Sequence, residues 1–582
     1  MAIRSISNIN VAGHAHARET VAPAPAGQPQ PEVLPQVSRH LLNSVFQSLS
    51  NDDIRLALED GIVPIAWLPY HVFYAQKEGS SALAPGHVVG RIEPAIFDLA
   101  VEQIFARRLA KRATLGLAKS MPLLSAHRRF TNPQAFCLFL LTLSLIASVI
   151  FLPHDFSHHL FGITFSIFFS TMIWLRLLAL HEPPARQRQD PERDDSKLPI
   201  YTVLVPLFRE VSVLPQILAA LDNLNYPATK LDIKLIIEEN DKAMRYAMAK
   251  QNLASHFQVL MVPTGRIQTK PRALNYALNF ARGSLVTIYD AEDIPEPMQL
   301  RMAAKAFGAL PENYACLQAE LSFYNPNENW LTRQFTTEYA TLFKLILPAL
   351  SANQLPIPLG GTSNHFRKSI LQTVGGWDAH NVTEDADLGF RLARLGYQSS
   401  MLNSTTFEEA NTTIANWLHQ RARWFKGFLQ TWLVHMRQPI VLINEIGFAG
   451  FMTMQAAVLG VVLSAAIYPI FMGTTIFHIG AALWSTEVMT WSWDNIAQGI
   501  YIGLFGVGSA VMIYSGAEAL RRKHLFGWWA TLATMPLYWL LASIAAWLSF
   551  WQLATNPFHW NKTRHGLSRL VLRPKPKTSI SN

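Results

Sequence analysis

The stretch Leu285–Asp293, read LVTIYDAED, decides how the central part of this 582-residue chain is interpreted. Its apolar and β-branched beginning is typical of a buried strand, and three carboxylates then follow within four residues. We therefore expect a strand that ends in an acidic loop. Hard oxygen ligands in that place suit Mg²⁺ or Mn²⁺ held against a diphosphate, so Asp290, Glu292 and Asp293 are candidate metal ligands. A solvated acidic turn is the plainer alternative.

The segments around this strand alternate between β and α patterns. Strands are predicted at 200–205, 233–237, 258–262 and 285–289, and helices at 214–224 and 272–281. Alternation at this spacing predicts an α/β, Rossmann-like domain with a mostly parallel sheet, whose ligands bind at the carboxyl ends of the strands.

Polar residues stand where those strands end. Pro206 and Glu210 follow the first strand, and Glu239 and Asp241 follow the second, where a carboxylate can accept from a uracil imide or a ribose hydroxyl. Lys270 opens the next helix, a position suited to phosphate. Each of these residues alone would more often be surface decoration.

A second acidic cluster begins at Thr383 and continues with Glu384 and Asp385. One interpretation is a helix start, with Thr383 as the N-cap and the carboxylates complementing the helix dipole. The other makes one carboxylate the general base that takes a proton from an acceptor hydroxyl, and Asp385 is preferred for that role. Upstream, Gly361 and Thr362 belong to a polar loop that either faces the substrates or forms a plain turn.

The pentapeptide Gln420–Trp424, read QRARW, lies on a predicted helix. Arg423 is suited to a diphosphate, Trp424 to stacking on a sugar ring, and Gln420 to a hydrogen bond on the same helical face. An amphipathic interfacial helix would contain the same residue types.

The composition favours a polytopic membrane protein with a soluble insert. Hydrophobic residues make up 50% and charged residues 15%, the mean hydropathy is +0.14, and the net charge is +9. Basic residues concentrate beside apolar runs, at 128–129, 521–523 and 564–577, which indicates membrane lipids and not nucleic acid as their partner. The two cysteines form no CxxC pair, so neither a disulfide framework nor a zinc site is indicated.

These patterns predict an order of domains. We expect a disordered N-terminus at 1–35, a small α+β domain at 36–120, two transmembrane helices within 134–181, the catalytic domain at 198–438, three or four transmembrane helices within 445–552, and a basic cytoplasmic tail at 553–582. Arginines flank the first pair of helices at their outer ends, so the central domain is expected to be cytoplasmic. A basic tail on the same side requires an even number of C-terminal crossings or a last helix lying in the interface.

Taken in order, the motifs resemble those of family 2 inverting glycosyltransferases, in the membrane branch that includes cellulose and hyaluronan synthases. The resemblance covers about 198–438 and implies a GT-A domain inserted between transmembrane helices, with a UDP-sugar donor. It implies roles residue by residue: Glu239 or Asp241 at the nucleotide, Asp290 with Glu292 or Asp293 at metal and diphosphate, Asp385 as base, and Gln420, Arg423 and Trp424 holding the donor near the acceptor channel. Glu292 stands where many members have Asp, and EEND at 238–241 replaces the commoner Asp-Asp-Gly.

The resemblance further implies processive synthesis of a β-glycan at a bacterial inner membrane. Two alternatives are transfer of one sugar to a lipid and a receptor or export scaffold whose transferase domain is vestigial. The stretch 556–566 looks like the cytoplasmic tail of a bacterial subgroup of these enzymes. Residues 36–120 look like the N-terminal domain of type II secretion ATPases, which implies cyclic di-GMP as a ligand and export proteins as partners, although the Arg-Leu-Gly repeat usual in nucleotide-binding versions is not evident.

Overall fold

The computed structural model describes residues 34–49, 53, 56–57, 60–68, 71–80, 84–100, 105–151, 154–183, 190–484, 493–557, 566 and 568. Of the N-terminal segment predicted to be disordered, only 34–35 fall within these residues. The chain divides into two compact units, Met1–Ala100 and Val101–Asn582.

The first unit is a small α+β domain, as the sequence predicts for this region. Its strands β1 (Ile62–Leu68), β2 (His71–Lys77) and β3 (His87–Ile92) form one sheet, in which β1 and β2 are antiparallel and β2 and β3 parallel. Helices α1 (Arg39–Ser48) and α3 (Pro94–Ala100) pack together through an edge-to-face contact of Phe46 and Phe97.

The second unit is built on an eight-stranded sheet of order β6-β5-β4-β7-β10-β9-β11-β8. Its first half is parallel and consists of β4 (Tyr201–Leu207), β5 (Leu231–Glu238), β6 (Phe257–Val262) and β7 (Leu285–Ile288). These are the four strands that the sequence predicts. Because neighbouring parallel strands β4, β5 and β7 end on the same edge, their following loops converge there.

The second half of the sheet departs from the parallel prediction. Strand β10 (Asn364–Arg367) pairs antiparallel with both β7 and β9 (Tyr314–Phe323), β9 is parallel to β11 (Gln398–Glu408), and the short β8 (Ile294–Pro295) closes the edge antiparallel to β11. The sheet is therefore mixed. The short β10 lies where the parallel order ends.

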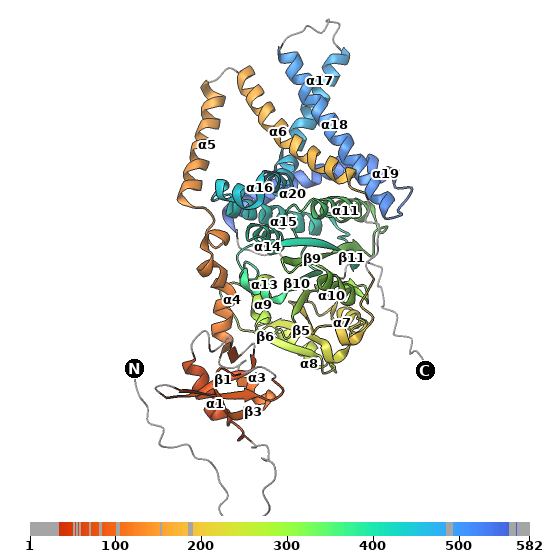
Figure 1. Ribbon diagram of the computed structural model, residues 1–582. Helices are drawn as coiled ribbons and strands as arrows, with labels where there is room; N and C mark the ends of the chain where they lie inside the picture. Colours follow the sequence, from red (N-terminus) through yellow and green to blue (C-terminus); the bar gives the residue numbers. More distant parts are fainter. Residues whose placement is uncertain are drawn as a thin grey trace, which may run out of the picture. The chain divides into compact units, whose positions relative to one another are not determined.

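Helices cover both faces of this sheet and position the site. They are α7 (Leu214–Asp222), α8 (Lys242–Ala249), α9 (Lys270–Leu278), α10 (Gln299–Ala309), α12 (Leu347–Ala352), α13 (Lys368–Thr373) and α14 (Glu384–Arg394). Strand β5 is buried along its whole length, and the charged side chains within it are paired, Lys234 with Asp232 at 2.8 Å and Glu238 with Arg272 at 3.2 Å. Figure 1 shows α11 (Trp330–Thr341), α15 (Ile414–His435), α16 (Pro439–Met454) and α20 (Met535–Thr555) between the sheet and the far ends of α17 (Val461–Trp484) and α18 (Trp493–Arg522).

Four stretches among the described residues are long and apolar enough to cross a membrane: Gly162–His181, Pro439–Ala481, Ile496–Arg522 and Met535–Thr555. They belong to α6 (His154–His181), α16 with α17 (Val461–Trp484), α18 (Trp493–Arg522) and α20; the remaining apolar helix, α5 (Asn132–Phe151), contains a shorter apolar segment. At 43 residues, the stretch from Pro439 would be about 65 Å long if straight, roughly twice the hydrocarbon core. It is not straight, because Gly447 breaks α16 with φ 71°.

The end of α20 returns to the catalytic region. Backbone carbonyls of Asn556 and Pro557 accept from Lys426 and Gln430 of α15, at 3.3 and 2.9 Å. The amides of Gly566 and Ser568 donate to Glu409, just after β11. The described residues of the tail therefore lie against the catalytic region.

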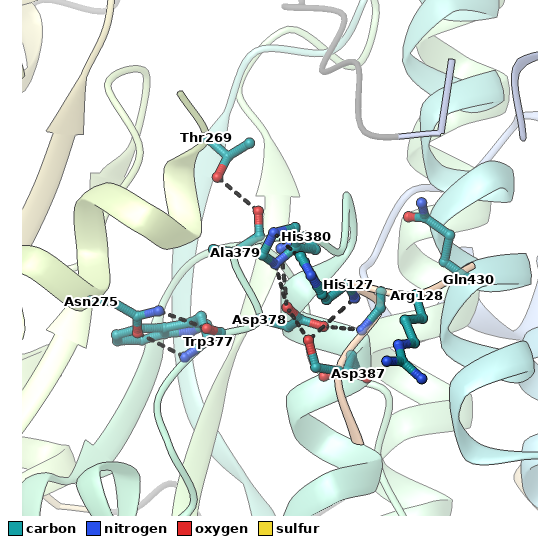
Figure 2. Close-up of polar contacts among 12 residues, drawn as sticks. His127, Arg128, Thr269, Asn275, Trp377, Asp378, Ala379, His380, Asp387 and Gln430 are labelled. Atoms are coloured by element: carbon teal, nitrogen blue, oxygen red, sulfur yellow. Dashed lines mark hydrogen bonds and ion pairs between the residues drawn. The ribbon is translucent and has the colours of Figure 1, made fainter. Parts of the chain in front are cut away.

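The connection between α4 (Ala106–Ser120) and the first apolar helix is fastened to the catalytic region. Asp378 accepts from the amide of Ala126 at 2.5 Å and from the hydroxyl of Ser125 at 3.2 Å, and Nδ1 of His127 lies 3.1 Å from Nε2 of His380 (Figure 2). The adjoining carbonyl of Ala379 accepts from Thr269, the residue before α9. The loop that leads to α14 is thus clamped from two sides.

Candidate active site

A cavity of about 430 Å³ opens where the loops after β4, β5 and β7 meet α14 and α15. The predicted site residues that line it are Pro206, Glu210, Lys270, Asp290, Glu292, Gly361, Thr362, Glu384, Asp385, Gln420, Arg423 and Trp424. The same cavity is also lined by residues of α6, α17, α18 and α20. Most sequence-predicted site residues therefore surround one space that reaches the apolar helices.

Lys270 joins the two acidic clusters. Its ammonium lies 2.6 and 2.8 Å from the two carboxylate oxygens of Asp290 and also donates to the carbonyl of Gly361 at 2.6 Å. Burial opposes its charged form, but the nearby carboxylates of Asp290 and Glu384 outweigh it and raise the pKa of Lys270. It therefore stays a cation, suited to a phosphate.

The acidic loop after β7 divides into two parts. Asp290 and Glu292 line the cavity, and burial together with the charge of Asp290 raises the pKa of Glu292 to about 8. Asp293 is fully buried; one of its oxygens accepts from the hydroxyl of Thr362 and the backbone amide of Asp290, and burial and the neighbouring carboxylates raise its pKa well above the usual range. Asp293 therefore shapes the loop.

No group of three metal-ligating side chains is preformed among the described residues. Asp290 and Glu292 nevertheless fit a divalent cation, since they present hard oxygen atoms to the cavity and a cation would offset both the burial and the charge of Asp290 that raise the pKa of Glu292. Asp293, one of the three predicted ligands, does not face the cavity and fits less well.

Glu384 and Asp385 occupy the first turn of α14 and face the cavity. Burial, and then the charge of Asp385, raises the pKa of Glu384 to about 7; burial also raises the pKa of Asp385. Thr383 is the N-cap residue of α14 and the carboxylates lie in its first turn, as one interpretation predicts, but the Thr383 side chain makes no capping hydrogen bond. An added Cβ at Gly361 would lie 3.2 Å from an oxygen of Asp385, so glycine permits the loop to approach the carboxylate.

The QRARW segment lies in the middle of α15. Gln420, Arg423 and Trp424 line the cavity, and the oxygen of Gln420 accepts from Asn411 at 2.7 Å. The charges nearest to Arg423 are those of Glu384, Asp385 and Asp290, so this arginine faces both acidic clusters. This arrangement places a cation and an aromatic face beside the candidate base.

Arg421, which the sequence analysis passes over, is bound more extensively than its neighbours. It makes two 2.6 Å hydrogen bonds to the oxygens of Glu338 on α11, and Tyr538 of α20 donates to the same carboxylate at 2.5 Å. Its guanidinium also lies 4.9 Å from the ring centre of Trp424. The pair Arg421–Glu338 therefore locks three helices together behind Trp424. Sequence offers no signal for it, because Glu338 is far away in the chain.

The residues expected at the nucleotide are only partly at the cavity. Glu239 accepts from the amide and hydroxyl of Thr264 at 2.9 and 2.8 Å, while Asp241 caps α8 and accepts from the amide of Arg209. Neither of these two residues lines the cavity. Glu238 does line it, and its carboxylate is paired with the buried Arg272. Burial raises the pKa of Glu238 to about 7.

Glu408, at the end of β11, is a further cavity residue without a sequence prediction. Burial and the charges of Asp293 and Glu292 raise its pKa well above the usual range. Its position after the last long strand is the signal that could have found it.

Comparisons with known proteins find similarity to glycosyltransferases. Residues 285–563 match the family model described as Glycosyl transferase family group 2. The match covers the second half of the mixed sheet and the apolar helices that follow it.

The glycosyltransferase domain also has curated relatives. The "Probable glycosyltransferase YdaM" of Bacillus subtilis is 26% identical over 50% of this chain and 74% of its own length. A beta-monoglucosyldiacylglycerol synthase of Trichormus variabilis is 27% identical over 45% of this chain, and a glucomannan 4-beta-mannosyltransferase of Arabidopsis thaliana is 25% identical, also over 45%. The chain spans about half the length of these last two, 56% and 51%.

Among solved structures, a mannosyltransferase from Pyrobaculum calidifontis in complex with GDP-Man and Mn²⁺ matches 68% of this chain and 99% of its own, with a TM-score of 0.41 and 17% identity. Residues 1–349 of TarS from S. aureus, in complex with UDP-GlcNAc, match with a TM-score of 0.31 and 12% identity.

Proposed function

We propose that this membrane glycosyltransferase transfers a sugar from a UDP-sugar, with inversion, to a hydroxyl group of a growing glycan. One observation carries the proposal: a single cavity joins the Lys270–Asp290 pair, the Glu384–Asp385 pair and the apolar helices. Such a cavity can hold a charged donor at one end and receive a lengthening product at the other.

The chemical step is one displacement. Asp385 takes the proton of the acceptor hydroxyl, and the acceptor oxygen forms a bond to the anomeric carbon of the donor sugar. The bond from that carbon to the phosphate oxygen breaks as UDP leaves. Lys270 and Arg423 stabilise the charge on the departing diphosphate. Asp290 and Glu292 would hold Mg²⁺ or Mn²⁺, which when bound supplies further charge neutralisation at the diphosphate.

We propose polymerisation because of the aromatic side chains in the cavity. Trp424, Tyr468, Tyr538 and Trp539 line the cavity, and such rings are suitable surfaces for successive sugar units. The catalytic domain and tail are placed on the cytoplasmic side of the inner membrane, because arginines flank the first pair of apolar helices.

Transfer of a single sugar to a lipid is the second candidate. The cyanobacterial relative is a synthase of a glucosyl diacylglycerol, and the cavity reaches helices that border lipid. A vestigial receptor or export scaffold is disfavoured, because both acidic clusters face the cavity. We also propose that the first unit binds cyclic di-GMP and export proteins. The test for the nucleotide is whether cyclic di-GMP changes the rate of UDP release by the full chain.

The test is a screen of UDP-sugars with purified full-length protein in nanodiscs, with UDP release and product size as readouts. We expect release from one donor, loss of release with EDTA and recovery with Mg²⁺ or Mn²⁺. A long polymer with an inverted linkage supports the proposal, whereas a monoglycosylated lipid selects the second candidate. Failure of every donor to release UDP would contradict both.

A further inference from the structure

Arg176 is a charged residue inside an apolar stretch, on the cavity-facing side of α6. Phe169, Met172 and Arg176 all line the cavity, and their spacing of three and four residues places them on one helical face. Ile167, Trp174 and Leu177 of the same helix are exposed. The arginine therefore points into the protein and not toward lipid.

The guanidinium of Arg176 has little to bind within the described chain. Its Nε is buried without a hydrogen-bond partner among the described residues. The carboxylate with an electrostatic influence on it is that of Glu338, whose two oxygens already bind Arg421 and Tyr538. Glu338 is therefore committed to Arg421 and not to Arg176.

The polar groups that α17, α18 and α20 present to the cavity are neutral. Ser464, Tyr468, Ser509, Tyr538 and Trp539 line it together with apolar residues of the same helices. An arginine within a membrane-spanning segment is costly, and such residues are paired or face a water-filled cavity. A neutral sugar hydroxyl would not balance its charge, but an anion would, through a charge-assisted hydrogen bond.

We propose that Arg176 forms a binding site for an anionic group, a carboxylate or a phosphate, carried by the acceptor. The inference rests on the proposed function, since it assigns a chemical class to the acceptor of the same cavity. Asp290, Glu292, Glu384 and Asp385 line the same cavity and repel an anion, so the cation of Arg176 is what would hold it. Its two chemical sources are an acidic sugar of the glycan and the phosphate of a lipid carrier.

The experiment measures binding, so that it does not depend on turnover. Full-length protein in phosphatidylcholine nanodiscs is titrated with two matched pairs of probes: a hexuronate tetrasaccharide against its carboxyl-reduced form, and a polyprenyl phosphate against the polyprenol. Tryptophan fluorescence reports binding. We expect the charged member of one pair to bind at least about 10-fold more tightly, and which pair responds identifies the source.

Three variants locate the effect. Arg176→Gln should bind both members equally, Arg176→Lys should keep part of the preference, and Met172→Leu, on the same wall, should keep all of it. Equal binding of charged and neutral probes by the unmodified protein would overturn the inference, as would an unchanged preference in Arg176→Gln. If Arg176→Gln does not fold, a reduced preference in Arg176→Lys decides for the site, and an unchanged preference decides against it. Preserved discrimination without sugar transfer would instead contradict only the proposed function.

Discussion

The two acidic clusters of the glycosyltransferase domain, Asp290–Asp293 and Glu384–Asp387, share a plan but differ in their buried member. In each, two carboxylates face the cavity and one is fully buried behind them. Asp293 is bound by a hydroxyl and an amide, whereas Asp387 lies 3.1 Å from Arg391 and 3.3 Å from His435, both also fully buried. Adjacent acids of one motif therefore have separate tasks, and only the second cluster depends on a buried charge pair.

The largest effect on stability should come from Asp387→Asn. Removing one partner of a buried ion pair leaves Arg391 uncompensated, so we expect a loss of about 3–5 kcal/mol in unfolding free energy. Asp293→Asn leaves no cation without its partner, so we expect a loss of only about 1 kcal/mol in unfolding free energy. Unfolding of both variants in detergent, followed by tryptophan fluorescence, makes the comparison. Equal losses would show that the two buried acids are equivalent.

Glu338→Gln tests a carboxylate of the cavity wall that belongs to neither cluster. It weakens the bidentate pair with Arg421, and a cost of about 1.5–3 kcal/mol is expected. Because Trp424 lies against Arg421, kcat should fall more than the donor KM rises. Glu328→Gln, on a different loop of the same domain, is the control. A change confined to the donor KM would contradict a positioning role.

The pH dependence separates the second cluster from an ordinary acidic turn. Burial, and then the charge of Asp385, raises the pKa of Glu384 to about 7, and burial also raises the pKa of Asp385. A protonated base cannot accept the acceptor proton, and protonation of Glu384 removes a charge beside it, so kcat/KM should fall as the pH drops below 7. The profile is measured from pH 5.5 to 8 with a stable buffer series. A flat profile would exclude titration of this pair.

The smallest effect concerns the contacts of Ser125, Ala126 and His127 with the loop before the second cluster. His127→Ala removes the contact with His380 and should cost about 1 kcal/mol. Burial, and then His380, lowers the pKa of His127 in the folded protein, so the unfolded chain binds the proton more readily below pH 6.5. The unmodified protein should lose this stabilisation as the pH falls, and the variant should show a weaker pH dependence. An identical pH dependence of stability in the variant and the unmodified protein would show that His127 is not its source.

Much of the fold could be predicted from sequence because β4, β5, β6 and β7 follow one another with the helix and strand periods of a parallel sheet. The antiparallel β10 could not, since NHFR carries no strand pattern and forms only between β7 and β9. At the site, short motifs mark Lys270, Asp290, Asp385 and Arg423. Pairings across helices, such as Arg421 with Glu338, depend on tertiary packing and leave no local trace. Likewise, local sequence does not distinguish cavity-facing Asp290 from buried Asp293.

The most direct test of the central claim is incorporation of labelled sugar by Asp385→Asn, with binding of UDP measured on the same preparation. If Asp385 accepts the acceptor proton, the variant should remain in the membrane and bind UDP normally, while incorporation falls at least about 100-fold. Near-normal incorporation would contradict the assignment of Asp385 as the base.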